Sequence, residues 1–180
     1  MAQRDFSREG LEEEGPGRRR EPAWGVPPPV YRPDDTQPPA PEKDRPTGAR
    51  IMVVDDDDVV RRVIHRTLAV FGYECAEAAS AFEAMDLIGE FHPHVTLSDV
   101  HMEEMDGMEL LGFLRDFDPD VQVILLTGKP DLGAAVRAMK SGASDYLSKP
   151  VEADRLVQAI ESALEKRRMA RQLREYQNNL

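Results

Sequence analysis

Five polar side chains of this sequence end or directly follow short segments that predict β-strands. They are three carboxylates, a hydroxyl and an ammonium group: Asp55, Asp56, Asp99, Thr127 and Lys149. In a parallel sheet wound with helices, ligands bind outside the carboxyl ends of the strands. We therefore expect these five groups to share one crevice, although they are far apart along the chain.

Three carboxylates in one crevice need a compensating charge, because like charges within a few ångströms raise one another's pKa. A hard divalent cation supplies that charge, and Mg²⁺ prefers carboxylate, carbonyl and water oxygens. A carboxylate can also accept a phosphoryl group, a reaction that needs an in-line nucleophile, a metal and fixed positive charge. The pattern therefore predicts magnesium-dependent transfer of a phosphoryl group to a carboxylate.

The segments that must position these groups alternate with helical patterns from residue 50 onward. Predicted strands cover residues 51–54, 73–78, 95–98, 121–126 and 145–147. The alternation predicts an α/β fold with a doubly wound parallel sheet of five βα units. The second strand is expected near one edge, and the fourth, the most apolar, at the sheet centre. In the strand order 2-1-3-4-5, the first and third strands are neighbours, which brings Asp55 and Asp56 beside Asp99.

Polar residues mark where several helices begin. Ser80 and Glu83 have the spacing of a capping box, in which two side chains satisfy free backbone N–H groups reciprocally. The third helix is expected to begin near Asp106, and the fourth at Pro130 and Asp131. Each of these helices would start directly after a predicted strand and its loop.

Composition divides the chain into three parts. Ten of the fourteen prolines lie within the first 49 residues, where apolar periodicity is lost, so residues 1–48 are expected to be a disordered arm. Residues 49–166 are expected to form the folded domain. Residues 50–155 hold 10 basic and 21 acidic side chains, which argues against a nucleic-acid-binding surface and fits a cation-binding cleft.

The C-terminal helix, predicted from Val151 onward, is too long for a compact domain of this size. Its first apolar positions can pack on the sheet: Leu156, Ile160 and Leu164. Residues 167–180 carry a second set at 4-3-4 spacing: Met169, Leu173, Tyr176 and Leu180. This set predicts a coiled-coil extension and a homodimer through the helix. A solvated, fraying helix is the alternative.

Cysteine content and hydropathy indicate the compartment. Cys75 is the single cysteine of the chain, which excludes an intramolecular disulfide. No apolar stretch has the length of a signal peptide or a membrane span. We therefore expect a cytoplasmic protein that does not enter a membrane.

Four segments resemble the defining motifs of response-regulator receiver domains, in the same order and on the same strands. They are residues 53–56 (VVDD), 98–102 (SDVHM), 126–128 (LTG) and 145–150 (DYLSKP). The resemblance covers about residues 50–166, and the joint occurrence of the motifs is highly specific. It implies a CheY-like, flavodoxin-like (βα)5 sheet of order 2-1-3-4-5. It also implies a two-component phosphorelay protein whose phosphoryl donor is a sensor histidine kinase or a histidine phosphotransfer protein.

The resemblance assigns roles at the strand ends. Asp99 is implied to be the phosphoacceptor. Asp55, Asp56 and Asp99 are implied to hold Mg²⁺ together with the main-chain carbonyl of His101. Lys149 is implied to pair with Asp99 before the reaction and with a phosphoryl oxygen after it. No enzyme activity is implied beyond phosphorylation and dephosphorylation of Asp99 itself.

Four further residues are implied to carry or tune the response. Thr127 would swing toward the phosphoryl group, and Tyr146 would then move inward and change the face formed by the fourth helix, fifth strand and fifth helix. His101 and Lys129 lie two residues beyond Asp99 and Thr127, at positions that influence how long the phosphoryl group survives. Exchanging these two residues is expected to change the rate of dephosphorylation and to leave the acceptor unchanged.

One loop departs from the family pattern. Receiver domains usually carry Met-Pro after the phosphoacceptor, whereas here Met102 is followed by Glu103 and Glu104. The loop loses the backbone restriction of a proline and gains negative charge near the metal. Magnesium binding or loop closure is therefore expected to differ from the family pattern.

A phosphatase is the strongest alternative. Residues 55–59 (DDDDV) also satisfy the D-x-D-x-[TV] pattern of haloacid-dehalogenase-type phosphatases. In that alternative Asp55 is the nucleophile, and Thr127 and Lys149 serve as later motifs. The alternative leaves Asp99 without a role, and the acidic residues that follow the lysine lie on a predicted helix rather than after a strand.

The output of the domain stays open at the level of sequence. A DNA-binding helix-turn-helix has no room after residue 166, so direct nucleic-acid binding is not expected. Residues 171–180 resemble the connector between receivers and appended signalling enzymes, including HD-type cyclic-dinucleotide phosphodiesterases. The chain is then a piece of a longer protein; a stand-alone receiver that binds a partner is the other interpretation.

Overall fold

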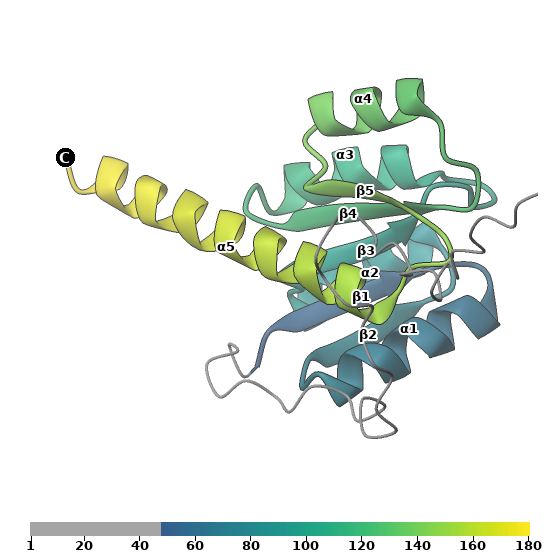
Figure 1. Cartoon of the computed structure of the whole chain (residues 1–180). Helices are drawn as coiled ribbons and strands as arrows, with labels where there is room; N and C mark the ends of the chain where they lie inside the picture. Colours follow the sequence, from purple (N-terminus) through teal and green to yellow (C-terminus); the bar gives the residue numbers. More distant parts are fainter. Residues whose placement is uncertain (1–47) are drawn as a thin grey trace, which may run out of the picture. The chain divides into compact units, whose positions relative to one another are not determined.

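The structure is a computed structural model that describes residues 48–180 of the chain. The arm predicted over residues 1–48 lies outside the described residues except for Gly48, so its disorder stays a prediction. Five parallel strands form one sheet in the order β2-β1-β3-β4-β5 (Figure 1). The doubly wound α/β fold and the strand order expected from the sequence are confirmed.

Strands and helices alternate strictly along the described chain. The strands are β1 (Arg50–Val54), β2 (Glu74–Ala78), β3 (Val95–Asp99), β4 (Gln122–Thr127) and β5 (Asp145–Ser148). The helices are α1 (Asp58–Val70), α2 (Ala81–Phe91), α3 (Gly107–Phe117), α4 (Leu132–Lys140) and α5 (Ala153–Asn178).

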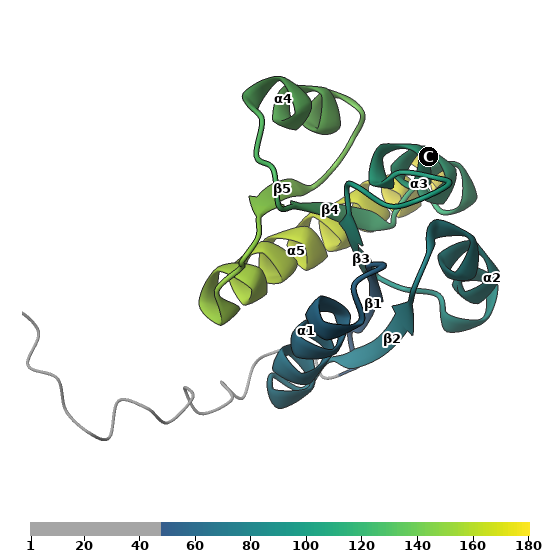
Figure 2. The same cartoon turned by 90° about the vertical axis from the view of Figure 1, so that its right-hand side faces the viewer.

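Helices cover both faces of the sheet because successive strand residues point to opposite sides. In β1, Ile51 and Val53 pack with α1 and α5, whereas Met52 and Val54 pack with α2 and α3. Figure 2 shows α1 and α5 on one side of the sheet and α2 and α3 on the other. This two-layer burial explains why the inner strands are mostly apolar on both faces.

The central strand is β3, not the most apolar strand β4. β4 lies between β3 and β5, so the predicted position of residues 121–126 at the centre is wrong by one strand. Burial on both faces produces an apolar run in any inner strand, and β3 is fully buried as well despite Thr96 and Ser98. β2, as expected, lies at one edge.

The start of α2 differs in detail from the expected capping. Ser80 Oγ accepts a hydrogen bond from the Glu83 N–H at 3.1 Å, but the Glu83 carboxylate accepts from the N–H of Ala79 rather than from that of Ser80. The reciprocal half of the predicted box is therefore displaced by one residue. A complete capping box forms instead at the start of α3, between Asp106 and Glu109.

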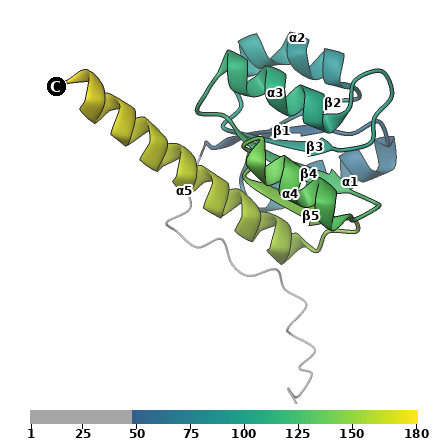
Figure 3. The ribbon, with the colours of Figure 1, turned by 90° about the horizontal axis from the view of Figure 1, so that it is seen from above.

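The last helix continues past the sheet without interruption (Figure 3). Leu156 and Ile160 are buried against the sheet and Leu164 is partly buried there, as expected. The four apolar residues of the predicted seam are all exposed: Met169, Leu173, Tyr176 and Leu180. Within residues 48–180, no helix has both the length and the apolar character needed to cross a membrane.

Ion pairs tie this extension to the domain. Arg167 Nη1 lies 3.1 Å from Asp118 Oδ2, and Arg174 Nη1 lies 2.9 Å from Asp120 Oδ2. Both aspartates belong to the segment between α3 and β4. The extension is thus held at two points two helical turns apart, and its apolar seam stays exposed.

Candidate functional site

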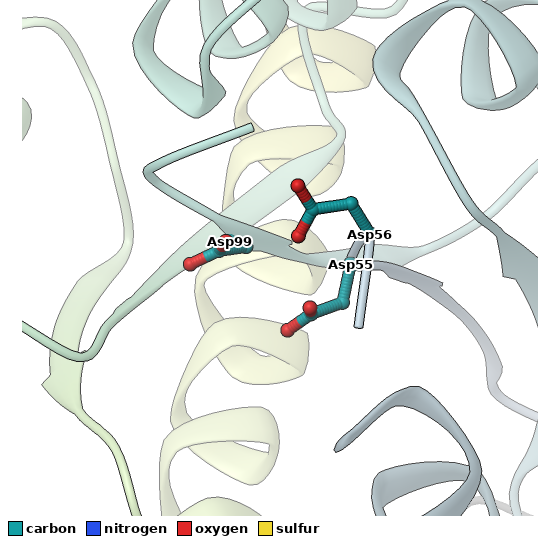
Figure 4. A group of neighbouring side chains, drawn as sticks. All are labelled: Asp55, Asp56 and Asp99. Carbon is teal, nitrogen blue, oxygen red and sulfur yellow. The ribbon is translucent and has the colours of Figure 1, made fainter. Parts of the chain in front are cut away.

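The predicted carboxylates meet at the carboxyl ends of β1 and β3. Asp55 and Asp56 directly follow β1, and Asp99 is the last residue of β3. Ligand oxygens of the three side chains all lie within 4.8 Å of one another, and Figure 4 shows the side chains side by side. Asp55 and Asp99 are buried, with 1% and 6% of their surface exposed, while Asp56 is exposed.

Lys149 supplies the positive charge of this cluster. Its Nζ lies 2.6 Å from Asp55 Oδ2 and 3.1 Å from Asp99 Oδ1. Its backbone N–H donates to the carbonyl of Thr127 at 2.7 Å, which links the ends of β4 and β5. The bond from Lys149 to Pro150 is cis.

The cluster holds more negative than positive groups. Burial raises the pKa of Asp99; the hydrogen bond and charge of Lys149 act against this, and the charges of Asp55 and Asp56 add to the rise. Burial lowers the pKa of Lys149, but its contacts with Asp55 and Asp99 outweigh burial and raise it. One ammonium group therefore faces three carboxylates, and burial makes the ionisation of Asp99 unfavourable.

This donor set fits a hard divalent cation. Carboxylate oxygens from two neighbouring strands converge on one point, one of the three carboxylates is exposed to solvent, and the local charge is negative. Such oxygen ligands, with room for water, are those that Mg²⁺ prefers. The residues present could therefore hold the predicted Mg²⁺.

The other predicted site residues lie around the cluster with different surroundings. Thr127 ends β4 and is buried; its Oγ1 accepts from the Lys129 N–H at 3.0 Å and donates to the Lys129 carbonyl at 3.2 Å. His101 and Lys129 are exposed on the loops after β3 and β4. Tyr146 is half-buried in β5 and packs against the α2 and α3 side of the core. The roles predicted for these four residues stay predictions.

Two residues that support the site were missed by the sequence interpretation. A Cβ on Gly107 would lie only 2.3 Å from the main-chain oxygen of Asp99, so the start of α3 packs directly on the predicted acceptor. Arg61 in α1 is buried and donates to the main-chain oxygen of Asp55 at 2.7 Å. A sequence signal for Arg61 existed: its position is three and seven residues before Ile64 and Leu68, on the same face of the helix as these two buried residues.

The loop after β3 closes without the proline usual in receiver domains. Glu104 takes a left-handed backbone with φ of 66°, a conformation that side-chain-bearing residues adopt rarely. The Met105 N–H donates to the Glu103 carbonyl at 2.8 Å, and the Gly107 N–H to that of Val100 at 3.0 Å. The loop thus closes through its own backbone bonds and brings Gly107 onto the end of β3.

A comparison with known protein families identifies the family that contains this site. Residues 51–161 match the family model of the response regulator receiver domain. The chain belongs to this family. It is a receiver domain of the two-component response-regulator type, and the match disfavours the phosphatase alternative. The geometry agrees, because Asp99, which that alternative leaves without a role, is a buried carboxylate that contacts Lys149.

Two bacterial regulators that the chain resembles are longer proteins. The C4-dicarboxylate transport transcriptional regulatory protein DctD of Rhizobium meliloti is 39% identical over 119 residues, which are 66% of this chain and 26% of that protein. The DNA-binding transcriptional regulator NtrC of Escherichia coli is 38% identical over 129 residues, 72% of this chain and 28% of NtrC. The chain thus spans about a quarter of the length of these relatives.

Solved receiver structures resemble the fold over nearly their whole length. A response regulator receiver domain protein from Clostridium thermocellum has a TM-score of 0.65 at 35% identity, covering 68% of this chain and 98% of that one. The signal receiver domain of an HD domain-containing protein from Pseudomonas fluorescens has a TM-score of 0.63 at 31% identity, covering 67% and 97%. Neither comparison extends over the whole of this chain.

Proposed function

We propose that Asp99 is the residue of this receiver domain that accepts the phosphoryl group. The observation that carries the proposal is its position: a buried carboxylate at the end of β3, beside Lys149 and two further carboxylates. An Asp99 oxygen attacks phosphorus as the bond from phosphorus to the donor's histidine nitrogen breaks. The donor class is a sensor histidine kinase or a histidine phosphotransfer protein, and the reaction takes place in the cytoplasm.

The surrounding residues have complementary roles in this proposal. Asp55, Asp56 and Asp99, with the main-chain carbonyl of His101, hold Mg²⁺, which when bound neutralises charge that develops on the phosphoryl oxygens. Lys149 already lies between two carboxylates and needs only to exchange one carboxylate contact for a phosphoryl oxygen. The phosphoryl oxygens then carry negative charge in place of the charge that Asp99 loses when its carboxylate becomes an acyl phosphate.

The response is proposed to run through Thr127 and Tyr146. Among residues 48–180, the hydrogen bonds of Thr127 Oγ1 are with the backbone of Lys129 in its own loop, so turning toward Asp99 breaks two local bonds and forms one to the phosphoryl group. Tyr146 and residues of β5, the β5–α5 loop and the start of α5 line a cavity of about 380 Å³, and the ring is proposed to move relative to this cavity. Exchange of His101 and Lys129, both exposed beside the site, changes the rate of dephosphorylation.

The extension is proposed to connect the receiver to its output. We divide the chain into an arm (1–48), the receiver (49–166) and a helical extension (167–180). The exposed seam of the extension suits a second copy of this chain in a two-stranded coiled coil. Relatives named as DNA-binding regulators are longer than this chain, so output through a further domain is one form of this proposal and partner binding by the receiver alone is the other.

Labelling with a small phosphodonor tests the acceptor. Acetyl phosphate with Mg²⁺ should label the wild-type chain and not Asp99→Asn. Asp116→Asn, which alters an exposed aspartate of α3, is the matched control and should label normally. Label retained in Asp99→Asn and lost in Asp55→Asn would contradict the proposal and favour the phosphatase alternative.

A further inference from the structure

Arg61 is a buried cation beside the acidic cluster whose role the proposed function leaves unassigned. Its side chain is only 11% exposed, although arginine usually keeps its charged end in water. It lies in the first part of α1, directly after the loop that carries Asp55 and Asp56. A charge in this position has to be explained by what it contacts.

The guanidinium group joins three segments of the chain. Nη1 donates to the main-chain oxygen of Asp55 at 2.7 Å, and Nη2 donates to Asp58 Oδ1 at the start of α1. Nε lies 3.5 Å from Glu77 Oε2 on β2. The planar five-donor fork of arginine suits such a three-way contact, whereas lysine offers a single point charge.

The contact with Asp55 bears on the metal site through the peptide bond. The register of β1 with its neighbours ends at Val54, so the Asp55 carbonyl lies beyond the sheet ladder and takes its hydrogen bond from Arg61. A peptide unit is planar; fixing this carbonyl therefore fixes the orientation of the Asp56 N–H and the position of the Asp56 Cα. Arg61 thus restrains the backbone from which the two carboxylates that follow β1 extend.

The charge of Arg61 is compensated by carboxylates that do not belong to the cluster of Asp55, Asp56 and Asp99. Burial lowers its pKa, but the contacts with Asp58 and Glu77 outweigh burial and raise it, so the group stays charged. Since Asp58 and Glu77 compensate that charge, Arg61 does not serve as a counter-ion for Asp99; Lys149 does. Its effect on the cluster is geometric.

We propose that Arg61 is a positioning residue that holds the Asp55–Asp56 peptide in the geometry a small octahedral cation requires. This inference rests on the proposed magnesium site. Mg²⁺ demands near-ideal octahedral geometry at about 2.0–2.1 Å, whereas Ca²⁺ accepts irregular arrangements at about 2.3–2.6 Å. Loss of Arg61 should therefore weaken Mg²⁺ binding more than Ca²⁺ binding.

Calorimetric titration of the unphosphorylated full chain with MgCl₂ and with CaCl₂ tests this. In Arg61→Met the Mg²⁺ dissociation constant should rise by roughly 10- to 100-fold, the usual effect of removing a residue that orients a metal ligand. The Ca²⁺ constant should rise clearly less. Arg62→Met, which alters the exposed neighbour on α1, is the matched control and should change neither constant.

Arg61→Lys keeps the buried charge and decides the matter if Arg61→Met does not fold. It should show the same fall in preference for Mg²⁺ over Ca²⁺, because one ammonium group cannot hold three segments. Unchanged Mg²⁺ affinity, or equal loss for both ions, in a folded variant overturns the inference. Failure of the wild-type chain to bind Mg²⁺ would instead overturn the proposed metal site.

Discussion

Lys149 Nζ lies nearer to Asp55, at 2.6 Å, than to Asp99, at 3.1 Å. The lysine therefore compensates two buried carboxylates at once, in addition to its proposed role toward a phosphoryl oxygen. Its removal would leave both carboxylates without a cation. This double contact gives Lys149 a role in the stability of the metal-free chain in addition to its proposed role in phosphoryl transfer.

Lys149→Met should destabilise the metal-free chain. Removing one partner of a buried ion pair costs about 3–5 kcal/mol, because the remaining charge is left uncompensated. Urea unfolding in EDTA measures the loss, and Mg²⁺ should restore part of it. The exposed lysine at the end of α4 provides the control: Lys140→Met should unfold like the wild type, and equal unfolding of the two variants would contradict the ion-pair role.

Asp99 should make the stability of the metal-free chain depend on pH. Burial raises its pKa in the folded state. At pH values between the unfolded and the folded pKa, the folded chain therefore retains a proton that the unfolded chain has lost. The favourable contribution of that proton is fully present below the unfolded pKa and is lost as pH rises through the folded value.

Asp99→Asn removes this ionisation and should therefore stabilise the chain at neutral pH. The difference in free energy of unfolding between Asp99→Asn and the wild type should shrink as pH falls toward the ordinary value of 3.8. Urea unfolding in EDTA at a series of pH values measures it, with Asp116→Asn as the control. A difference that does not vary with pH would show that Asp99 ionises normally in the folded chain.

Most of what could be predicted about the site from the sequence concerned residues at the ends of strands. The carboxyl ends of parallel strands lie at one edge, so residues as distant as Asp55, Asp99 and Lys149 could be placed together once the strand order was inferred. The position of β4 could not be derived from its apolar character, because every inner strand is buried on both faces. Burial and position in the sheet are separate properties.

Supporting contacts were beyond the reach of sequence patterns. Arg61 acts on Asp55 through a main-chain oxygen, and Gly107 matters through the space it leaves beside Asp99. Neither backbone oxygens nor empty space appear in a pattern of side chains. The shift of the Glu83 carboxylate from Ser80 to Ala79 is likewise a matter of local backbone geometry.

Gly107→Ala should destabilise the domain. The added Cβ would lie 2.3 Å from the Asp99 oxygen and 3.0 Å from Val100 Cα, and backbone atoms cannot move aside as a flexible side chain can. Overpacking of this kind costs about 1–3 kcal/mol, to be measured by thermal or urea unfolding. On the same helix, a Cβ at Gly112 meets nothing within 4 Å.

Gly112→Ala is therefore the control for Gly107→Ala. It should stabilise the chain by up to about 1 kcal/mol, the difference in helix propensity between the two residues. Opposite signs for two identical substitutions in one helix would show that space, not helix propensity, decides at residue 107. Stabilisation by both would mean that α3 does not pack against the end of β3 as described.

The ion pair of Arg174 with Asp120 should hold the extension of α5 in its helical form. Asp120 is 8% exposed, and its other oxygen, Oδ1, is buried with no hydrogen-bond partner among residues 48–180. Arg174→Ala therefore leaves a poorly solvated carboxylate without its cation, at a cost of about 1 kcal/mol. The loss falls on the last turns of the helix, where no buried apolar contact compensates.

Hydrogen exchange of the backbone amides measures this effect directly. In Arg174→Ala, amides near the end of α5 should exchange faster than in the wild type, while those of the sheet should be unchanged. Arg171→Ala removes an exposed arginine three residues earlier in the same helix and should leave exchange nearly unaltered. Equal exchange in the two variants would mean that association through the exposed seam, rather than the pair with Asp120, keeps the extension helical, because that contact would protect the amides in both.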